Sequence, residues 1–168
     1  MIQKILGRIR AIIYPKVKYR GPRIRIYGWN RIKTNGKFNI NTGSRIKCYK
    51  SARIFIGNNV TIGSYSRIIS MNSIAVGDNT IIADFVAILD HNHTESKSLE
   101  NWIGYSSKPI HIGTKCWLGD GVKVLSGVTL GNNVTVAANS VVTKSFESNV
   151  IIGGVPARIL KYKLNDED

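Results

Sequence analysis

The sequence predicts an all-β protein, a parallel β-helix whose short strands wind around one aliphatic core. Three observations predict this fold: an aliphatic residue recurs every six positions, a small residue often follows it, and one long polar stretch interrupts the rhythm. A six-residue unit suits a short strand followed by a corner, and three units complete one triangular coil. We expect this domain at residues 21–155, between an N-terminal segment, 1–20, and a C-terminal tail, 156–168.

The repeat is regular from about residue 56 onward. The first position of each unit is β-branched or leucine, and we expect it to point inward: Ile56, Ile62, Ile68, Val76, Ile82, Ile88, Ile112, Leu118, Val124, Leu130, Val136 and Val142. The fifth position should also point inward and is small or β-branched: Val60, Ser66, Thr80, Val86, Cys116, Val122, Val128, Val134 and Ser140. The stretch from Ile24 to Ile54 follows the pattern more loosely and is predicted to form the first coils.

Asparagine pairs occupy expected corners of the coils. Asn58–Asn59 and Asn132–Asn133 each follow an inward aliphatic residue and a glycine. Asparagine tolerates the left-handed backbone conformation better than most residues, which suits a sharp corner. These pairs therefore mark where one strand ends and the next begins.

Charge is distributed unevenly along the chain, whose formal net charge is +14. All ten acidic residues lie from Asp78 onward, so the charged residues among positions 1–77 are all lysine or arginine. A one-sided charge field indicates an anionic partner such as nucleic acid, anionic lipid or a phosphorylated substrate, although a basic face can also serve solubility alone. The sequence has no nucleic-acid motif and no basic strip interleaved with aromatic residues, so we do not expect nucleic acid.

Residues 1–13 carry aliphatic side chains at helical spacing, with cations offset from them, and Pro15 ends the pattern. This predicts a short basic amphipathic helix that either caps the first coil or lies on anionic lipid. The sequence lacks an apolar run of transmembrane length and a signal-peptide cleavage site. We therefore expect a cytoplasmic protein, whose basic helix would allow peripheral contact with the inner membrane face. Cys48 and Cys116 are far apart and fit reduced thiols.

The polar stretch at residues 89–111 is predicted to be a loop ejected from one corner of the β-helix. It opens with Asp90, His91, Asn92 and His93. A histidine titrates near neutrality and can accept a proton from an attacking hydroxyl, and a carboxylate can orient its ring. If the stretch is extended, both histidines point to the same side. The alternative is a polar loop whose histidines only form local hydrogen bonds.

Five motifs appear in a fixed order, "KPIHIG", "CWLG", "SGVTLG", "NSVVTK" and "GGVPAR". With the repeat, they resemble the hexapeptide-repeat acyltransferases, and most closely the maltose, galactoside and polysaccharide O-acetyltransferases, over about residues 50–160. This resemblance implies a left-handed parallel β-helix, a homotrimer, and acetyl-coenzyme A bound in a groove between neighbouring subunits. By motif, the implied coenzyme-binding residues are Trp117, Gly119, Ala138, Thr143, Lys144 and Arg158.

The resemblance also suggests which histidine is the base. In the family this histidine lies seven residues after an inward valine, and counting from Val86 gives His93. We expect Asp90 to orient it, with His91 as the rival for the base. Asn92, Glu95 and Glu100 are candidates for binding the acceptor. At Gly104 the sugar acetyltransferases usually carry a glutamate, and either Glu95 or Glu100 would have to replace it.

A zinc site built from His91, His93 and His111 is the alternative use of the three histidines. The related hexapeptide carbonic anhydrases also use three histidines, but with the wide spacing before the close one, whereas this sequence has the close spacing first. We therefore expect no metal.

The predicted reaction is acetyl transfer from acetyl-coenzyme A to a hydroxyl of a bacterial surface polysaccharide or its precursor. We expect direct attack without an acyl-enzyme, because neither cysteine has a histidine neighbour at motif spacing. Two alternatives are acetyl transfer to the nitrogen of an amino sugar and a non-enzymatic β-helix that binds an anionic glycan.

Overall fold

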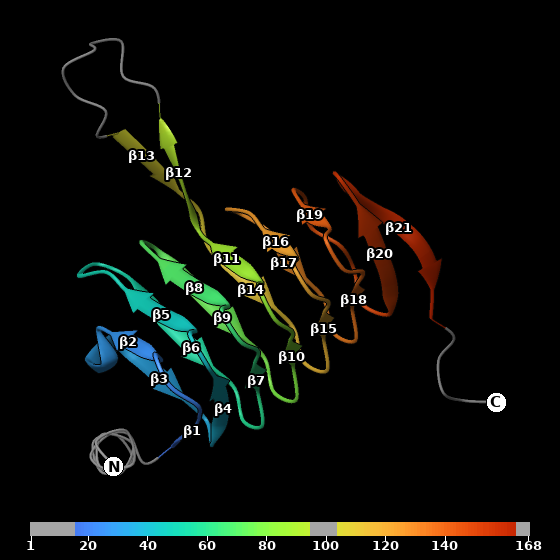
Figure 1. Ribbon diagram of the computed structural model, residues 1–168. Helices are drawn as coiled ribbons and strands as arrows, with labels where there is room; N and C mark the ends of the chain where they lie inside the picture. The colour runs from blue at the N-terminus through green and yellow to red at the C-terminus, as the bar shows by residue number, and fades with distance from the viewer. Residues whose placement is uncertain (1–15, 95–103, 164–168) are drawn as a thin grey trace.

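The computed structural model describes residues 16–94 and 104–163, which form a parallel β-helix with three faces (Figure 1). The predicted N-terminal helix, its cap or membrane role, Glu95, Glu100 and the last residues of the tail lie outside the described residues. Strands from successive coils stack in register, so each face of the helix is one sheet. The predicted all-β class is confirmed.

Sheet A contains β1 (Val17–Arg20), β4 (Phe38–Asn41), β7 (Thr61–Ile62), β10 (Ile81–Ile82), β15 (Trp117–Leu118), β18 (Thr135–Val136), β20 (Val150–Gly154) and β21 (Ala157–Tyr162). Sheet B contains β2 (Arg25–Tyr27), β5 (Arg45–Cys48), β8 (Arg67–Ser70), β11 (Ala87–Leu89), β16 (Lys123–Val124) and β19 (Val141–Val142). Sheet C contains β3 (Ile32–Thr34), β6 (Arg53–Ile56), β9 (Ser73–Val76), β14 (Ile110–Ile112) and β17 (Thr129–Leu130).

The core is the aliphatic column that the repeat predicts. All twelve first-position residues and all nine fifth-position residues named above are at most 1% exposed. Because consecutive coils align residue for residue, as Ile46 with Ile68 on neighbouring strands of sheet B, each side chain packs on its equivalent one coil away. This continuous burial is the main source of stability, since each coil buries its apolar side only against its neighbours.

The corners between sheets C and A hold a column of residues in the left-handed backbone conformation. Asn59, Asn79, Lys115, Asn133 and Asn149 all have φ between 54° and 61°. The predicted asparagine corners are therefore confirmed at Asn59 and Asn133. The side-chain amide of Asn59 donates to Oδ1 of Asn79 (3.0 Å), and that of Asn133 donates to Oδ1 of Asn149 (2.9 Å).

One hairpin leaves the stack, between β11 and β14, and Figure 1 shows it projecting from the coils. It consists of β12 (His91–Thr94) and β13 (Gly104–Ser107), which pair antiparallel. The interruption is thus shorter than the predicted 89–111, because Leu89 still belongs to β11 and His111 already belongs to β14. Both residues remain in the coil because they pair with adjacent strands, Leu89 with Ile69 and His111 with Ala75.

The coils extend beyond the predicted limits of 21 and 155. β1 pairs with β4 from Val17 onward, and β21 returns antiparallel along β20 as far as Tyr162. Weak periodicity at both ends hides these strands in the sequence. Within the described residues the helical structure is the three-residue 3-10 turn η1 (Trp29–Arg31), and none of it could span a membrane.

Candidate active site

The hairpin brings two of the three histidines to one face. Strand β12 places His91 opposite Ser107 and His93 opposite Tyr105. Alternate residues of a strand share a face, so both rings lie on the same side. Their centroids are 6.2 Å apart and their planes meet at 83°, an edge-to-face contact. The expectation that the two rings point the same way is confirmed.

Asp90 stands at the root of the hairpin and is fully buried. Its Oδ2 accepts hydrogen bonds from Ser70 Oγ (2.6 Å) and from the backbone N–H of Asn72 (2.9 Å). Its Oδ1 accepts a bond from the backbone N–H of Met71 (2.8 Å). A buried carboxylate is costly unless such donors surround it, and here the corner of the preceding coil supplies all three.

The carboxylate of Asp90 faces His91. Nδ1 of His91 lies 3.3 Å from Oδ1 of Asp90, and the His91 side chain is only 12% exposed. The predicted partner of Asp90 was His93. This residue lies two positions beyond His91 on β12, which is on the order of 6.6 Å further along the strand. His93 is exposed. A proton on Nδ1 of His91 would be donated to Asp90, leaving Nε2 as the acceptor of that ring.

Backbone contacts anchor the hairpin from below. The carbonyl of Asp90 accepts bonds from the backbone N–H of Lys108 (3.0 Å) and from Ser126 Oγ (2.8 Å). The side-chain amide of Asn72 reaches the carbonyl of Ser107 (3.4 Å). These hydrogen bonds attach the base of the hairpin formed by β12 and β13 to the preceding coil through Asn72 and to the following coil through Ser126.

Ser70, Asn72 and Ser126 were not among the predicted site residues. A signal for the first two was present, since the repeat slips by two residues between Ile68 and Val76. That slip is the enlarged corner that receives Asp90. Ser126 carries no comparable signal, because its partner is a backbone carbonyl of the preceding coil.

The residues implied in coenzyme binding fall into two groups. One group lies on sheet A and at its corner with sheet B. Trp117 is in β15 with its side chain 54% exposed, and Arg158 is in the edge strand β21. Gly119 lies under Ala138: a Cβ at Gly119 would be 2.8 Å from the backbone nitrogen of Ala138.

The other group lies at the edge of sheet B from which the hairpin leaves. Thr143 and Lys144 directly follow β19, and the hairpin follows β11. These strands are separated only by β16 in the order of the sheet, so they are two coils, or roughly 10 Å, apart. Both side chains are exposed. Within one chain, the histidines therefore share an edge with Thr143 and Lys144 and are separated by sheet B from Trp117.

Two further predictions concern ligands. Asn92 is exposed on β12, between the two histidines. His111 lies on β14, in register with Ala75 and Thr129. In the part of the chain that the structure describes, no three histidine, cysteine or acidic side chains gather closely enough to hold a metal ion.

Both cysteines are buried free thiols. Burial is the main cause that raises the pKa of Cys48 and of Cys116 above the ordinary value of 9.0. Because the thiolate is the nucleophilic form, a raised pKa makes both side chains poor nucleophiles at neutral pH.

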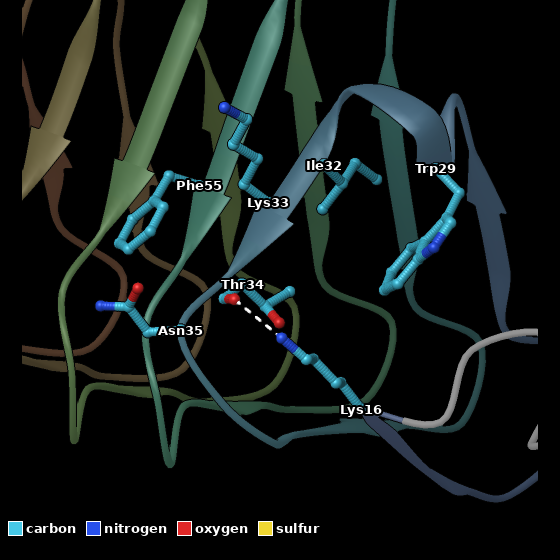
Figure 2. Close-up of a pocket in the computed structure, with 7 residues that line it drawn as sticks. All are labelled: Lys16, Trp29, Ile32, Lys33, Thr34, Asn35 and Phe55. Atoms are coloured by element: carbon cyan, nitrogen blue, oxygen red, sulfur yellow. Dashed lines mark hydrogen bonds between the residues drawn. The ribbon is translucent and has the colours of Figure 1, made fainter.

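A hollow of about 510 Å³ lies near the N-terminal end, away from the histidines. Figure 2 shows Trp29, Ile32 and Phe55 around it, with Lys16 donating to the carbonyl of Thr34 (3.3 Å). None of the predicted catalytic or coenzyme-binding residues lines this hollow.

Comparisons with known proteins identify the repeat and its relatives. Residues 109–144 match the family described as bacterial transferase hexapeptide (six repeats), and residues 53–83 match the hexapeptide repeat of succinyl-transferase. The chain is 35% identical over 173 residues to a putative lipopolysaccharide biosynthesis O-acetyl transferase, WbbJ, of Escherichia coli (strain K12), covering 95% of this chain and 88% of that protein. It is 34% identical to the galactoside O-acetyltransferase of the same organism, covering 70% of this chain and 57% of that protein.

Solved structures share the fold. A mutant of AntD, an N-acyltransferase from Bacillus cereus solved with dTDP and coenzyme A, has a TM-score of 0.76 at 18% identity, covering 88% of this chain and 82% of that one. A hexapeptide-repeat-containing acetyltransferase from Vibrio cholerae O1 biovar eltor, complexed with acetyl-coenzyme A, has a TM-score of 0.61 at 23% identity, covering 97% and 79%. The β-helix, the ordered motifs and the extended match to WbbJ agree, and the chain belongs to the hexapeptide-repeat acetyltransferase family.

Proposed function

We propose that this protein transfers the acetyl group of acetyl-coenzyme A to a hydroxyl of a bacterial surface polysaccharide or its precursor. The observation that carries the proposal is the histidine hairpin, held rigidly at its root by Asp90 and exposed at His93. The similarity to a relative named for lipopolysaccharide biosynthesis supports the choice of a surface glycan as acceptor.

His93 is the proposed general base. A base must reach the hydroxyl of a bound sugar, and His93 is exposed on the hairpin. It removes the proton of the hydroxyl as the oxygen attacks the thioester carbonyl, and coenzyme A leaves as the thiol. His91, fixed by Asp90, supports the ring of His93 by their edge-to-face contact.

His91 is the second candidate for the base. The observation in its favour is its contact with Asp90, because a carboxylate that holds one ring nitrogen leaves the other correctly placed to accept a proton. The two candidates differ in exposure and in partner, so single substitutions distinguish them.

We further propose that the complete site lies between subunits of a homotrimer. Trp117 and Arg158 are separated from the histidines by the width of sheet B, so one coenzyme molecule would reach both groups most directly if a second copy presents its sheet A to the hairpin edge of the first. A rotationally symmetric ring repeats such a head-to-tail contact at every interface. Lys144 and Arg158 would then bind coenzyme phosphates by charge-assisted hydrogen bonds.

The test is release of coenzyme A thiol from acetyl-coenzyme A with candidate glycans, followed by analysis of the acetylated product. We expect an ester on a sugar hydroxyl, and an amide on an amino sugar would replace the proposed acceptor. His93→Ala should lower kcat by about 10²–10⁴-fold, the range for a general base, while His91→Ala retains measurable turnover. The reverse pattern would assign the base to His91.

A further inference from the structure

Four arginines on the N-terminal coils take no part in the proposed acetyl transfer. Arg23, Arg25, Arg45 and Arg67 line a hollow of about 250 Å³, together with Gly43 and Tyr65. Strands β2, β5 and β8 begin with three of them, in register, so that Arg25 pairs with Arg45 and Arg45 with Arg67. These cations therefore stand one above another on sheet B, about 4.8 Å from strand to strand. We call the four residues the arginine ladder.

Within the described residues, no ion pair or hydrogen bond to a carboxylate compensates the arginine ladder. Among residues 16–94 and 104–163, arginine side chains donate hydrogen bonds only from Arg31, Arg53 and Arg158, and the one ion pair joins His91 to Asp90. Like charges directly opposite on neighbouring strands repel each other. A second copy aligned coil for coil would not neutralise them, since residues 1–77 contain no acidic residue.

An aromatic ring is held at the side of this hollow. Tyr65 stacks on Phe85, with ring centroids 5.5 Å apart and planes within 8°. Gly43 leaves room for the ring on its other side, because a Cβ there would be 2.5 Å from Tyr65 Cδ1. Tyr65 also has a φ of 56°, a conformation that is costly for a bulky residue. The backbone thus holds a large ring beside the arginines, at a position that suits glycine or asparagine better.

We infer that the arginine ladder binds the phosphate group of an anionic ligand. The planar guanidinium presents paired donors that match phosphate oxygens, and a phosphate among these cations would remove their repulsion. A soluble diphosphate and the headgroup of an anionic lipid share this chemistry. Arg67 pairs with Ala87, which precedes His91 by four residues, so the hollow lies on the order of 13 Å of strand from the catalytic hairpin. The inference therefore goes beyond the proposed acetyl transfer.

Calorimetric titration with inorganic pyrophosphate, without acetyl-coenzyme A, tests this site apart from the reaction. We expect saturable binding by the full-length protein, and a loss of affinity of at least about tenfold for each arginine removed in Arg45→Gln/Arg67→Gln. The matched control is Lys33→Gln/Lys37→Gln, which removes two exposed cations of the first two coils that do not line the hollow. The control should keep its affinity within about twofold, and thermal unfolding should show that both variants are folded.

Co-sedimentation with vesicles distinguishes the two sources of phosphate. Vesicles of phosphatidylcholine are compared with vesicles that also contain phosphatidylglycerol. Arginine-dependent binding of pyrophosphate alone assigns a soluble diphosphate, and arginine-dependent pelleting with anionic vesicles assigns a lipid headgroup. Equal losses in the arginine and lysine variants, or no binding of either probe, would overturn the inference.

Discussion

Asp90 connects the β-helix to the hairpin through single atoms. Its carboxylate accepts bonds from the corner of one coil, and its carbonyl accepts bonds from Lys108 and from Ser126 on the other side. The same residue lies 3.3 Å from His91. The stability of this corner and the positioning of His91 therefore depend on one buried residue, through both its side chain and its carbonyl group.

Asp90→Asn should destabilise the protein by about 2–3 kcal/mol, because an amide offers one acceptor oxygen where the carboxylate offers two, and its NH₂ group would face a buried donor. Urea unfolding measures the change. The matched control is Asp78→Asn, in which the remaining oxygen can still accept the one bond from the backbone N–H of Asn58 at an exposed corner. Equal effects of the two substitutions would contradict the role assigned to Asp90.

The buried cysteines give a prediction with a definite pH dependence. Since the pKa of Cys48 and Cys116 is raised, the folded protein holds the thiol protons more tightly than the unfolded chain. The associated stability is complete below the unfolded pKa of about 9 and is lost as the pH rises through the folded values. We expect iodoacetamide to label neither cysteine of the folded protein at pH 8 within the time that labels both in urea, as mass spectrometry would show. Rapid labelling of folded protein at pH 8 would show that a thiol is accessible.

At the scale of elements, the corner column between sheets C and A is an interrupted asparagine ladder. Lys115 lies between Asn79 and Asn133: its backbone N–H donates to the carbonyl of Asp78, and the N–H of Asn133 donates to Thr114. It adopts the left-handed conformation that its asparagine neighbours tolerate better. The column therefore contains one position where a single substitution should improve the fold.

Lys115→Asn should stabilise the protein by about 0.5–1.5 kcal/mol. Asparagine relieves the strain of the left-handed backbone conformation, and its side-chain amide can form a hydrogen bond to the neighbouring coil. Lys115→Val should destabilise it by about 1–2 kcal/mol, because a β-branched residue fits the left-handed conformation poorly. Lys115→Ala removes the charge and the side chain beyond Cβ, adds neither a branch at Cβ nor an amide, and is the control. Chemical denaturation of the three variants gives the order, and a valine variant as stable as the asparagine variant would refute the argument.

At the scale of the whole molecule, the proposed site combines two faces that one chain holds apart. His93→Ala removes the proposed base from one face, and Trp117→Ala removes the aromatic side chain from the other. Each variant alone should be nearly inactive. If each site takes one face from each of two adjacent subunits, co-expression of both variants should restore about a quarter of the wild-type sites in randomly mixed rings.

Steady-state rates per subunit of the purified mixture measure this restoration, with the two proteins mixed without subunit exchange as the control. A mixture no more active than the separate variants would place the whole site within one chain.

The sequence predicts those parts of the structure that repeat. Ile62, Val86 and Leu118 are buried as the six-residue period requires, because each position meets the same surroundings in every coil. The repeat could not predict that Asp90 contacts His91 and not His93. That choice depends on how far β12 extends His93 from the corner, and β12 lies outside the repeat. The outer strands were also missed: β21 pairs antiparallel and is mostly exposed, so it shows no inward period.

The antiparallel return of β21 has a consequence for how the protein behaves at high concentration. A stack of parallel strands ends in a row of unsatisfied backbone groups, which is a template on which the first coil of another molecule could continue the stack into a fibre. β21 occupies that row on sheet A and, by reversing direction, offers a hydrogen-bonding pattern that a parallel coil does not match. On sheet A, β21 therefore disfavours the addition of a further parallel coil at this end of the stack.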